Sequence, residues 1–277
     1  MKLIQACSTL PYTCFDFERA LEGIAKAGFT HIGIWLYHAE KTVFSAEMTP
    51  AEMKTLARVM AAYNLKPYLT SMGLSASLDT EEGVRRCERE IELAGILGAP
   101  YVLGLGAYAY EHFPDKPLPA DIFRQKDRNF VVAMSRLAKH AEQHQITILI
   151  KPHTGNTATA RECIQTLKRI SHPRVKIAYD GGNVRYYEGI NPVEDVIPVA
   201  GQSECIIVKD HRGARANPEF PTPGDGEIDY AVLYRNARQH GFAGPLMVEV
   251  VRPEGESAEA VDVQIQKAKH YLDLIEQ

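Results

Sequence analysis

The chain has 277 residues, of which 45% are hydrophobic, so it is long enough to bury a large core. Its 31 lysines and arginines stand against 35 aspartates and glutamates, which gives a net charge of -4 at pH 7. Because no long basic run accompanies this balance, nucleic acid and membrane surfaces are disfavoured as main ligands. We therefore expect a globular protein whose partner is a small molecule.

The number and spacing of the five cysteines indicate neither a disulfide framework nor a zinc site. They lie at positions 7, 14, 87, 163 and 205 and show no C-x-x-C spacing. A reducing compartment fits this pattern best. The apolar part of the N-terminal stretch is too short for a signal-peptide core, and no apolar run approaches the length of a membrane span. The sequence thus predicts a soluble, cytoplasmic protein.

Short strand-like runs alternate with longer stretches of helical period along the whole chain. The clearest helix starts are TPAE at 49–52 and DTEE at 79–82, where a threonine can cap the first amides. The proline-rich segment 114–121 is predicted to be one long rim loop. Strands are expected, in chain order, at Leu3 to Cys7, His31 to Trp35, Lys66 to Thr70, Tyr101 to Gly104, Thr147 to Lys151, Val175 to Tyr179, Cys205 to Val208 and Pro245 to Val250.

About eight βα units in one chain predict a closed (β/α)8 barrel, or TIM barrel, that forms a single domain over residues 1–277. A doubly wound open sheet is the alternative, but no G-x-G-x-x-G motif follows the first predicted strand. In a barrel the active site lies at the carboxyl ends of the strands. The residues at those ends are therefore the candidates for function.

Charged and aromatic side chains occupy several of the predicted strand ends. Glu249 is the clearest candidate, because a carboxylate flanked by valines is hard to explain as a solvated side chain. Buried charges need partners, so we expect the charges on the later strands to converge. A structural or solvated role stays open for the other candidates, which are Trp35, Lys151, His153, Asp180, Lys209, His211 and Arg212.

Four stretches together resemble a known family. PHTGNTATA, YDGGNVRYYEGINP, IIVKDHRG and GDGEIDYAVLYRNARQHGFAGPLMVEV are similar to the xylose isomerase-like superfamily of sugar isomerases and epimerases, most specifically over residues 147–250. The resemblance implies a TIM barrel that acts on a sugar, a keto-sugar or a sugar-derived acid, and it leaves a homo-oligomer open. It also implies a divalent metal (Mn, Mg, Zn or Co) held by Glu, Asp, His and Glu at the ends of the fifth to eighth strands.

This chain matches only two of those four ligand positions, with Asp180 and Glu249. Where the family reads Glu-Pro-His the chain reads KPH at 151–153, and where the family reads His-x-Lys-Asp it reads IVKD at 207–210. A protonated lysine has no lone pair for a metal, and isoleucine has no donor atom. The formal charges of Lys151 and the two carboxylates sum to -1. The family's set of three carboxylates, a divalent ion and a neutral histidine has the same total charge. We therefore expect the ammonium of Lys151 to stand where the ion would stand.

The expected function is proton transfer next to a carbonyl, giving isomerisation, epimerisation or elimination without a metal cofactor. Glu249 is the expected base, Lys151 the electrophile and Asp180 its charge partner. Two alternatives stay open: a divalent-metal enzyme in which His153 or His211 replaces a ligand, and a silent barrel that binds a sugar or a partner protein. Substrate contacts are expected from Trp35, His153, Lys209, His211 and Arg212.

Overall fold

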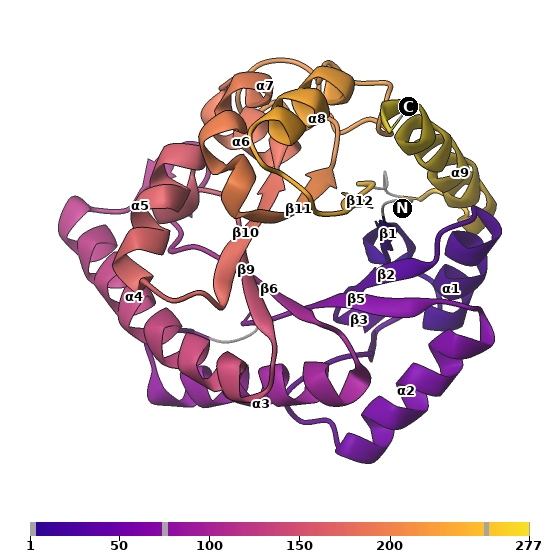
Figure 1. Ribbon diagram of the computed structural model, residues 1–277, viewed down its shortest axis with the longest axis horizontal. Helices are drawn as coiled ribbons and strands as arrows, with labels where there is room; N and C mark the ends of the chain where they lie inside the picture. The colour runs from indigo at the N-terminus through magenta and orange to yellow at the C-terminus, as the bar shows by residue number, and fades with distance from the viewer. Residues whose placement is uncertain (1–3, 74–76, 252–254, 277) are drawn as a thin grey trace.

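The computed structural model describes residues 4–73, 77–251 and 255–276 and contains a closed barrel of eight parallel strands ringed by helices (Figure 1). The strand order β1-β12-β11-β10-β9-β6-β5-β2 places the first and last strands side by side. The predicted (β/α)8 barrel is confirmed, and the open-sheet alternative is wrong. The barrel strands are β1 (Gln5–Ser8), β2 (His31–Ile34), β5 (Lys66–Ser71), β6 (Tyr101–Leu105), β9 (Thr147–Lys151), β10 (Val175–Asp180), β11 (Ser203–Val208) and β12 (Leu246–Val248).

All eight predicted strands are present, with small shifts at their ends; Leu3, predicted in the first strand, lies outside the described residues. Two short hairpins were not predicted, β3 (Tyr37–His38) with β4 (Lys41–Thr42) and β7 (Tyr110–His112) with β8 (Lys116–Pro117). The prediction of a loop over 114–121 was therefore wrong, since this segment contains β8 and the start of a helix. Strands of two or three residues are too short to show a hydrophobic alternation.

Helices follow the strands and cover the outside of the barrel (Figure 1). The capping box predicted at Thr49 and Glu52 is confirmed, and Thr80 caps the next helix by accepting from the Gly83 amide. Among the helices described, none combines the length and apolarity that a membrane span requires. The α-helices are α1 (Phe17–Lys26), α2 (Pro50–Ala62), α3 (Glu81–Leu97), α4 (Ala120–Gln143), α5 (Ala160–Ile170), α6 (Gly181–Glu188), α7 (Pro192–Asp195), α8 (Tyr230–Gln239) and α9 (Ala258–Ile275).

The apolar side chains form two layers. The larger layer fills the space between the strands and the helices, as the alternation along each strand requires. The smaller layer fills the inside of the barrel, so the barrel is a packed core and not a pore. The inner cluster consists of Ala6, Tyr68, Leu69, Leu103, Leu149, Ala178, Cys205, Ile207 and Met247.

A buried polar network joins the first and last helices where the barrel closes. Asp262 on α9 accepts a hydrogen bond of 2.6 Å from the hydroxyl of Tyr12, and its two oxygens accept from Arg19 at 3.0 and 2.6 Å. Tyr12 is fully buried and Asp262 is 8% exposed. Because a bidentate arginine pair is both strong and directional, this contact fixes α1 against α9.

Replacing Asp262 with alanine should lower the free energy of unfolding by about 3 kcal/mol, because it leaves a buried hydroxyl and a guanidinium without their acceptor. Urea unfolding monitored by circular dichroism measures this loss. The matched control is Glu259→Ala, which removes a carboxylate that is 80% exposed and lies 3.7 Å from the same guanidinium. The control should cost less than about 0.5 kcal/mol, and equal losses for the two variants would contradict the account.

Candidate active site

A cavity of about 320 Å³ lies at the carboxyl ends of the barrel strands. The inner cluster closes it from below, since Leu103 belongs to both. Residues that end or follow all eight barrel strands contribute to its wall, which is the arrangement that (β/α)8 enzymes use to assemble a site. The cavity is lined by Leu10, Trp35, Ser71, Leu103, Leu105, Lys151, His153, Asn183, Tyr186, Tyr187, Lys209, Phe220, Glu249 and Val251.

Two lysines and two carboxylates form a compact group of charges at this end of the barrel, which we call the four-charge cluster. The Nζ atom of Lys151 lies 2.9 and 3.0 Å from the two carboxylate oxygens of Glu249 and 2.9 Å from Oδ2 of Asp180. The Nζ atom of Lys209 lies 2.9 Å from Oε1 of Glu249 and 3.2 Å from Oδ2 of Asp180. Each ammonium therefore contacts both carboxylates.

The local sequence explains how Asp180 enters this cluster. Asp180 ends β10 and is also the N-cap of α6, where its Oδ1 accepts from the Asn183 amide at 2.9 Å and leaves Oδ2 for the lysines. Gly182 allows the start of α6 to approach the end of β11, because a Cβ atom there would lie 2.3 Å from the carbonyl oxygen of Lys209. The YDGG sequence thus brings a carboxylate and a lysine from different strands into contact.

The four charges sum to zero and are almost completely removed from water. Asp180 is fully buried, and the other three residues are 6 to 7% exposed. Burial disfavours the ammonium of Lys151, but the carboxylates of Glu249 and Asp180 outweigh this effect and raise its pKa. Burial likewise opposes the carboxylate of Glu249, yet the charges of Lys151 and Lys209 lower its pKa to about 2. All members whose pKa is shifted therefore stay ionised near neutral pH.

The two lysines differ in how many of their N–H groups form hydrogen bonds within the cluster. An ammonium group has three N–H donors. Lys151 donates two hydrogen bonds, at 2.9 and 3.0 Å, both to Glu249, whereas Lys209 donates one, at 2.9 Å. Their contacts with Oδ2 of Asp180, at 2.9 and 3.2 Å, are ion pairs without hydrogen-bond geometry. The Nζ atom of Lys209 also lies 5.6 Å from the centre of the Phe220 ring, which lines the cavity. Lys209 is therefore the lysine with more N–H donors left for a ligand.

His153 lines the cavity beside the cluster and is held by a neighbouring tyrosine. Its Nε2 lies 3.0 Å from the hydroxyl of Tyr187, while its buried Nδ1 has no hydrogen-bond partner. Burial, together with the charges of Lys151 and Lys209, lowers the pKa of His153 to about 3. The imidazole is neutral near pH 7 and can exchange only neutral hydrogen bonds with a ligand.

Aromatic rings form much of the remaining wall. Trp35, named from the sequence, follows β2 and lines the cavity, and it is joined by Tyr186, Tyr187 and Phe220. Ring centres lie 4.6 Å apart between the two tyrosines and 5.0 Å apart between Tyr186 and Phe220. The sequence analysis did not predict Tyr186, Tyr187 or Phe220, although the adjacent tyrosines right after the YDGG turn were a usable signal.

Asp210 fixes the loop that follows Lys209. Its carboxylate accepts from the amides of Gly224 and Gly226, each at 3.0 Å, and from the amide of Ile228 at 3.2 Å. A side chain at position 226 would collide with this carboxylate, because its Cβ would lie 2.1 Å from Oδ1. Asp210 is thus a loop anchor, and it orients the end of β11 next to Lys209. At the end of this loop, Asp229 caps α8 by accepting a hydrogen bond of 3.0 Å from the Val232 amide.

The two other predicted substrate contacts lie outside the cavity lining. His211 is fully buried behind the wall, where its Nε2 is 2.8 Å from the carbonyl oxygen of Asn217 and its ring packs on Tyr186 and Phe220. Arg212 points away and binds the Glu219 carboxylate and the carbonyl of Asp225. The side chains of His211 and Arg212 are therefore bound by residues of the same loop and do not face the cavity.

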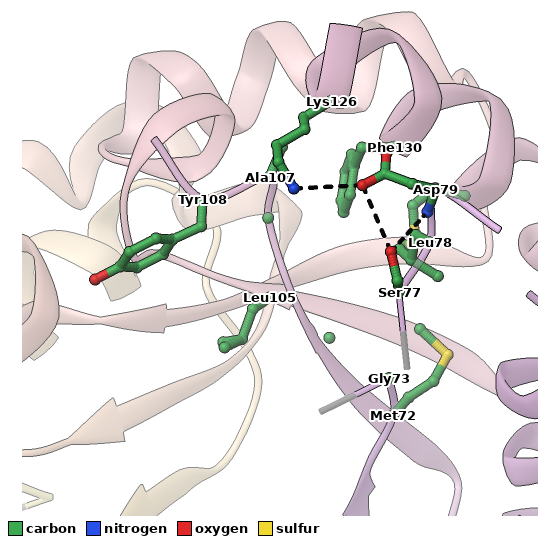
Figure 2. Close-up of a pocket in the computed structure, with 13 residues that line it drawn as sticks. Met72, Gly73, Ser77, Leu78, Asp79, Leu105, Ala107, Tyr108, Lys126 and Phe130 are labelled. Atoms are coloured by element: carbon green, nitrogen blue, oxygen red, sulfur yellow. Dashed lines mark hydrogen bonds and ion pairs between the residues drawn. The ribbon is translucent and has the colours of Figure 1, made fainter. Parts of the chain in front are cut away.

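A second hollow, of about 240 Å³, adjoins the first at Leu105 (Figure 2). Figure 2 shows that its polar groups are joined to one another: Lys126 lies 3.4 Å from Asp79, whose amide donates to Ser77. Asp79 also accepts from the Asn129 side chain at 2.9 Å. Because these groups already satisfy each other, the cavity with the four-charge cluster is the better candidate for chemistry.

The fold and the site together define a (β/α)8 barrel with a small-molecule-sized cavity at its carboxyl end, lined by charged, aromatic and aliphatic side chains. The chain belongs to the xylose isomerase-like TIM barrel family, whose model matches residues 21–268.

Three relatives illustrate how far the similarity extends. An inosose dehydratase of Clostridium botulinum is 24% identical over 259 residues, which covers 84% of this chain and 81% of that protein. The D-allulose 3-epimerase of a Methylomonas species superposes with a TM-score of 0.75 at 18% identity, over 99% and 98% of the two chains. A xylose isomerase-like TIM barrel protein from Mycobacterium smegmatis, solved with magnesium, gives a TM-score of 0.77 at 17% identity, over 99% and 96%.

The donor set at the strand ends does not fit the divalent ion that the family resemblance implies. Ile207, at one of the ligand positions, pairs with Asp180 across the sheet and packs in the apolar inner cluster. The ammonium of Lys151 occupies the space between the two remaining carboxylates. Neither His153 nor His211 forms, with Asp180 and Glu249, a trio whose ligand atoms all lie within 4.8 Å of one another. The charged side chains at these strand ends are thus paired with one another.

The four-charge cluster predicts a strong energetic coupling between Lys209 and Glu249. Lys209→Met leaves a net charge of -1 and Glu249→Gln leaves +1, so each should destabilise the fold by about 3 kcal/mol. The double variant is neutral again and should lose about 1–3 kcal/mol less than the sum of the two single losses. Urea unfolding of the four proteins gives this coupling.

An exposed ion pair provides the control for this cycle. Lys41 and Asp16 are 2.9 Å apart with side chains 76% and 67% exposed. The corresponding cycle with Lys41→Met and Asp16→Asn should give a coupling below about 0.5 kcal/mol. Additive losses at Lys209 and Glu249 would show that the cluster does not act as a unit.

Proposed function

We propose that this protein is an enzyme that moves a proton next to the carbonyl of a sugar-like substrate, in the cavity that holds the four-charge cluster. The observation that carries the proposal is Glu249, a carboxylate inside the cavity beside a lysine that has a donor left over. Relatives support the substrate class, since one is named as an inosose dehydratase and another as a D-allulose 3-epimerase. Both names describe chemistry on polyhydroxylated carbon chains or rings.

The resting cluster keeps Glu249 inactive as a base. A carboxylate with a pKa of about 2 is a weak acceptor for a carbon-bound proton. The two ammonium groups cause this, so any ligand that draws one of them away raises the basicity of Glu249. A substrate carbonyl that accepts from Lys209 would do so, and base activation would then depend on substrate binding.

In the proposed step, Glu249 takes the proton from the carbon next to the carbonyl, and the electron pair of that bond forms the enolate. Lys209 stabilises the enolate oxygen as it becomes negative. A proton given by Lys151 to the opposite face of the same carbon epimerises the substrate, and Lys151 is then reprotonated by Glu249. Return of the proton from Glu249 to the carbonyl carbon, after a proton has moved between the two oxygens, isomerises the substrate. Loss of a β-hydroxyl, which leaves as water with a proton from Lys151, gives elimination.

Lys151 serves in this scheme as a charge and a proton donor, and not as a nucleophile. Schiff-base formation requires a neutral amine. The carboxylates of Glu249 and Asp180 raise the pKa of Lys151 and hold it in the ammonium form. The same two contacts engage both carboxylates with the ammonium of Lys151, so the proposed reaction uses no divalent ion.

The cavity wall is suited to a compact polyol. Flat rings of Trp35, Tyr186 and Phe220 can cover the C–H faces of a sugar, while the neutral His153 and the side chain of Asn183 offer hydrogen bonds to hydroxyls. Asn183 is itself oriented by donating to the carbonyl of Pro152 at 2.8 Å. A volume of about 320 Å³ matches a single sugar ring and not an oligosaccharide.

Deuterium exchange tests the reaction class without knowledge of the product. Chelator-treated protein is incubated in D2O with a panel of inososes and ketoses, and exchange at the carbon next to the carbonyl is followed by proton NMR. The native protein should catalyse exchange with at least one compound, and Glu249→Gln should slow it by about 10²–10⁴-fold. Lys209→Met should slow it by at least about 10²-fold through loss of enolate stabilisation.

Lys168→Met provides the matched control, because Lys168 is exposed on α5 and does not line the cavity. Its exchange rate should equal that of the native protein. A Glu249→Gln variant that is folded but still exchanges at the native rate would contradict the role of Glu249. Stabilisation by sugars without any exchange would favour a barrel that binds sugars and does not turn them over.

The proposal that the reaction needs no metal can be tested by restoring the missing ligands and measuring how much metal the protein binds. Lys151→Glu combined with Ile207→His rebuilds the four-ligand set that the resemblance implies. After gel filtration, this variant should retain about one equivalent of Mn²⁺ or Zn²⁺ more than the native protein treated in the same way. Elemental mass spectrometry measures both. Activity of the native protein that disappears in chelator and returns with a metal would refute the proposal.

A further inference from the structure

A second group of potential ligands lies on the outer ring of helices. His140 is in the last turn of α4, His144 caps the same helix, and Glu92 lies on the neighbouring helix α3. One ligand atom from each of these side chains lies within 4.8 Å of the other two, and among the residues that the structure describes no other such trio of His, Cys, Asp and Glu occurs.

The spacing of these groups fits a metal ion better than it fits a hydrogen bond. The Nε2 atom of His140 lies 3.4 Å from Oε1 of Glu92, and this buried nitrogen has no hydrogen-bond partner. Two ligands that are each roughly 2.1 Å from one tetrahedral ion lie roughly 3.4 Å apart. The pair therefore already has the separation that a shared ion would impose.

His144 supplies the third ligand from the same helix. It is four residues after His140, so both rings project from one face of α4, and their centres are 4.7 Å apart. His144 is exposed and can rotate toward the other two groups without disturbing the core. Both histidines are also at the carboxyl end of α4, where the helix dipole favours a cation.

The position on the fold separates this trio from the cavity. The chain passes from His144 directly into Thr147, the first residue of β9, so the trio lies toward the amino ends of the strands. The four-charge cluster is at the opposite, carboxyl end of the same strands. An ion at the trio could not contact a substrate in the cavity, and it would instead link α3 to α4.

We propose that Glu92, His140 and His144 form a peripheral binding site for a divalent transition ion such as Zn²⁺, Co²⁺ or Ni²⁺. Two imidazoles and one carboxylate are the ligand types that these ions prefer, and water completes the coordination. Arg89 competes with a metal ion for the Glu92 carboxylate, because its guanidinium donates to Oε2 of Glu92 at 2.8 Å. That contact leaves Oε1 for the metal and orients it toward His140, while its positive charge limits the affinity.

The full-length protein, freed of metal by chelator, is titrated with Co²⁺, whose visible absorption reports nitrogen and oxygen coordination, and with Zn²⁺ by calorimetry. One ion should bind per chain, and the melting temperature should rise with the ion concentration. His140→Ala, His144→Ala and Glu92→Gln should each weaken binding at least tenfold. His144→Ala is the decisive variant, because this exposed residue can change without loss of folding.

His172 is the matched control, since its Nε2 lies 3.8 Å from a carboxylate oxygen of Glu142 with no third ligand in that group. His172→Ala should bind Co²⁺ as the native protein does. The proposal is overturned if the native protein binds no Co²⁺ or Zn²⁺, or if binding persists in His140→Ala and His144→Ala. Equal weakening by His172→Ala would also overturn it, because binding would then be unspecific.

Discussion

Two ammonium groups and two carboxylates share one dry volume at the end of the barrel, and most of the site follows from keeping these charges together. Each charge alone would cost several kcal/mol to bury, so removal of any one exposes the others to that cost. The cluster therefore constrains the strands that carry it: β9, β10, β11 and the residue after β12 must stay in register for the contacts to form. Below it, the apolar inner cluster excludes water and strengthens every one of these attractions.

The same arrangement explains how a lysine can stand at a position where the resemblance implies a metal ligand. An ion bridges carboxylates by coordination, whereas Lys151 and Lys209 bridge them by charge and hydrogen bonds. Ammonium groups can be drawn aside by a neutral oxygen more easily than a coordinated ion can be removed. In the function we propose, the site is then assembled in an inactive form, and substrate binding supplies the free energy that releases its base.

The sequence was sufficient for the barrel because eight apolar strand patterns recur at regular intervals, and parallel strands in a closed sheet must end at one face. For the same reason, Lys151, Asp180 and Glu249 could be expected to meet, since all three end or follow strands. The direction of loop side chains was not predictable. Lys209, expected to bind substrate, also belongs to the charge cluster, whereas Arg212, three residues later, is held by Glu219. Such choices depend on partners that are remote in sequence and on loop geometry.

Asp210 has a consequence for how this cavity could diversify. It secures the loop at 224–228 through backbone amides, so the contact itself requires no particular side chain except the glycine at 226. The exposed side chains of Asp225 and Glu227 can therefore be exchanged while the loop keeps its path and Lys209 keeps its place. A loop held by its main chain can change its surface residues by mutation without loss of the reactive groups next to it.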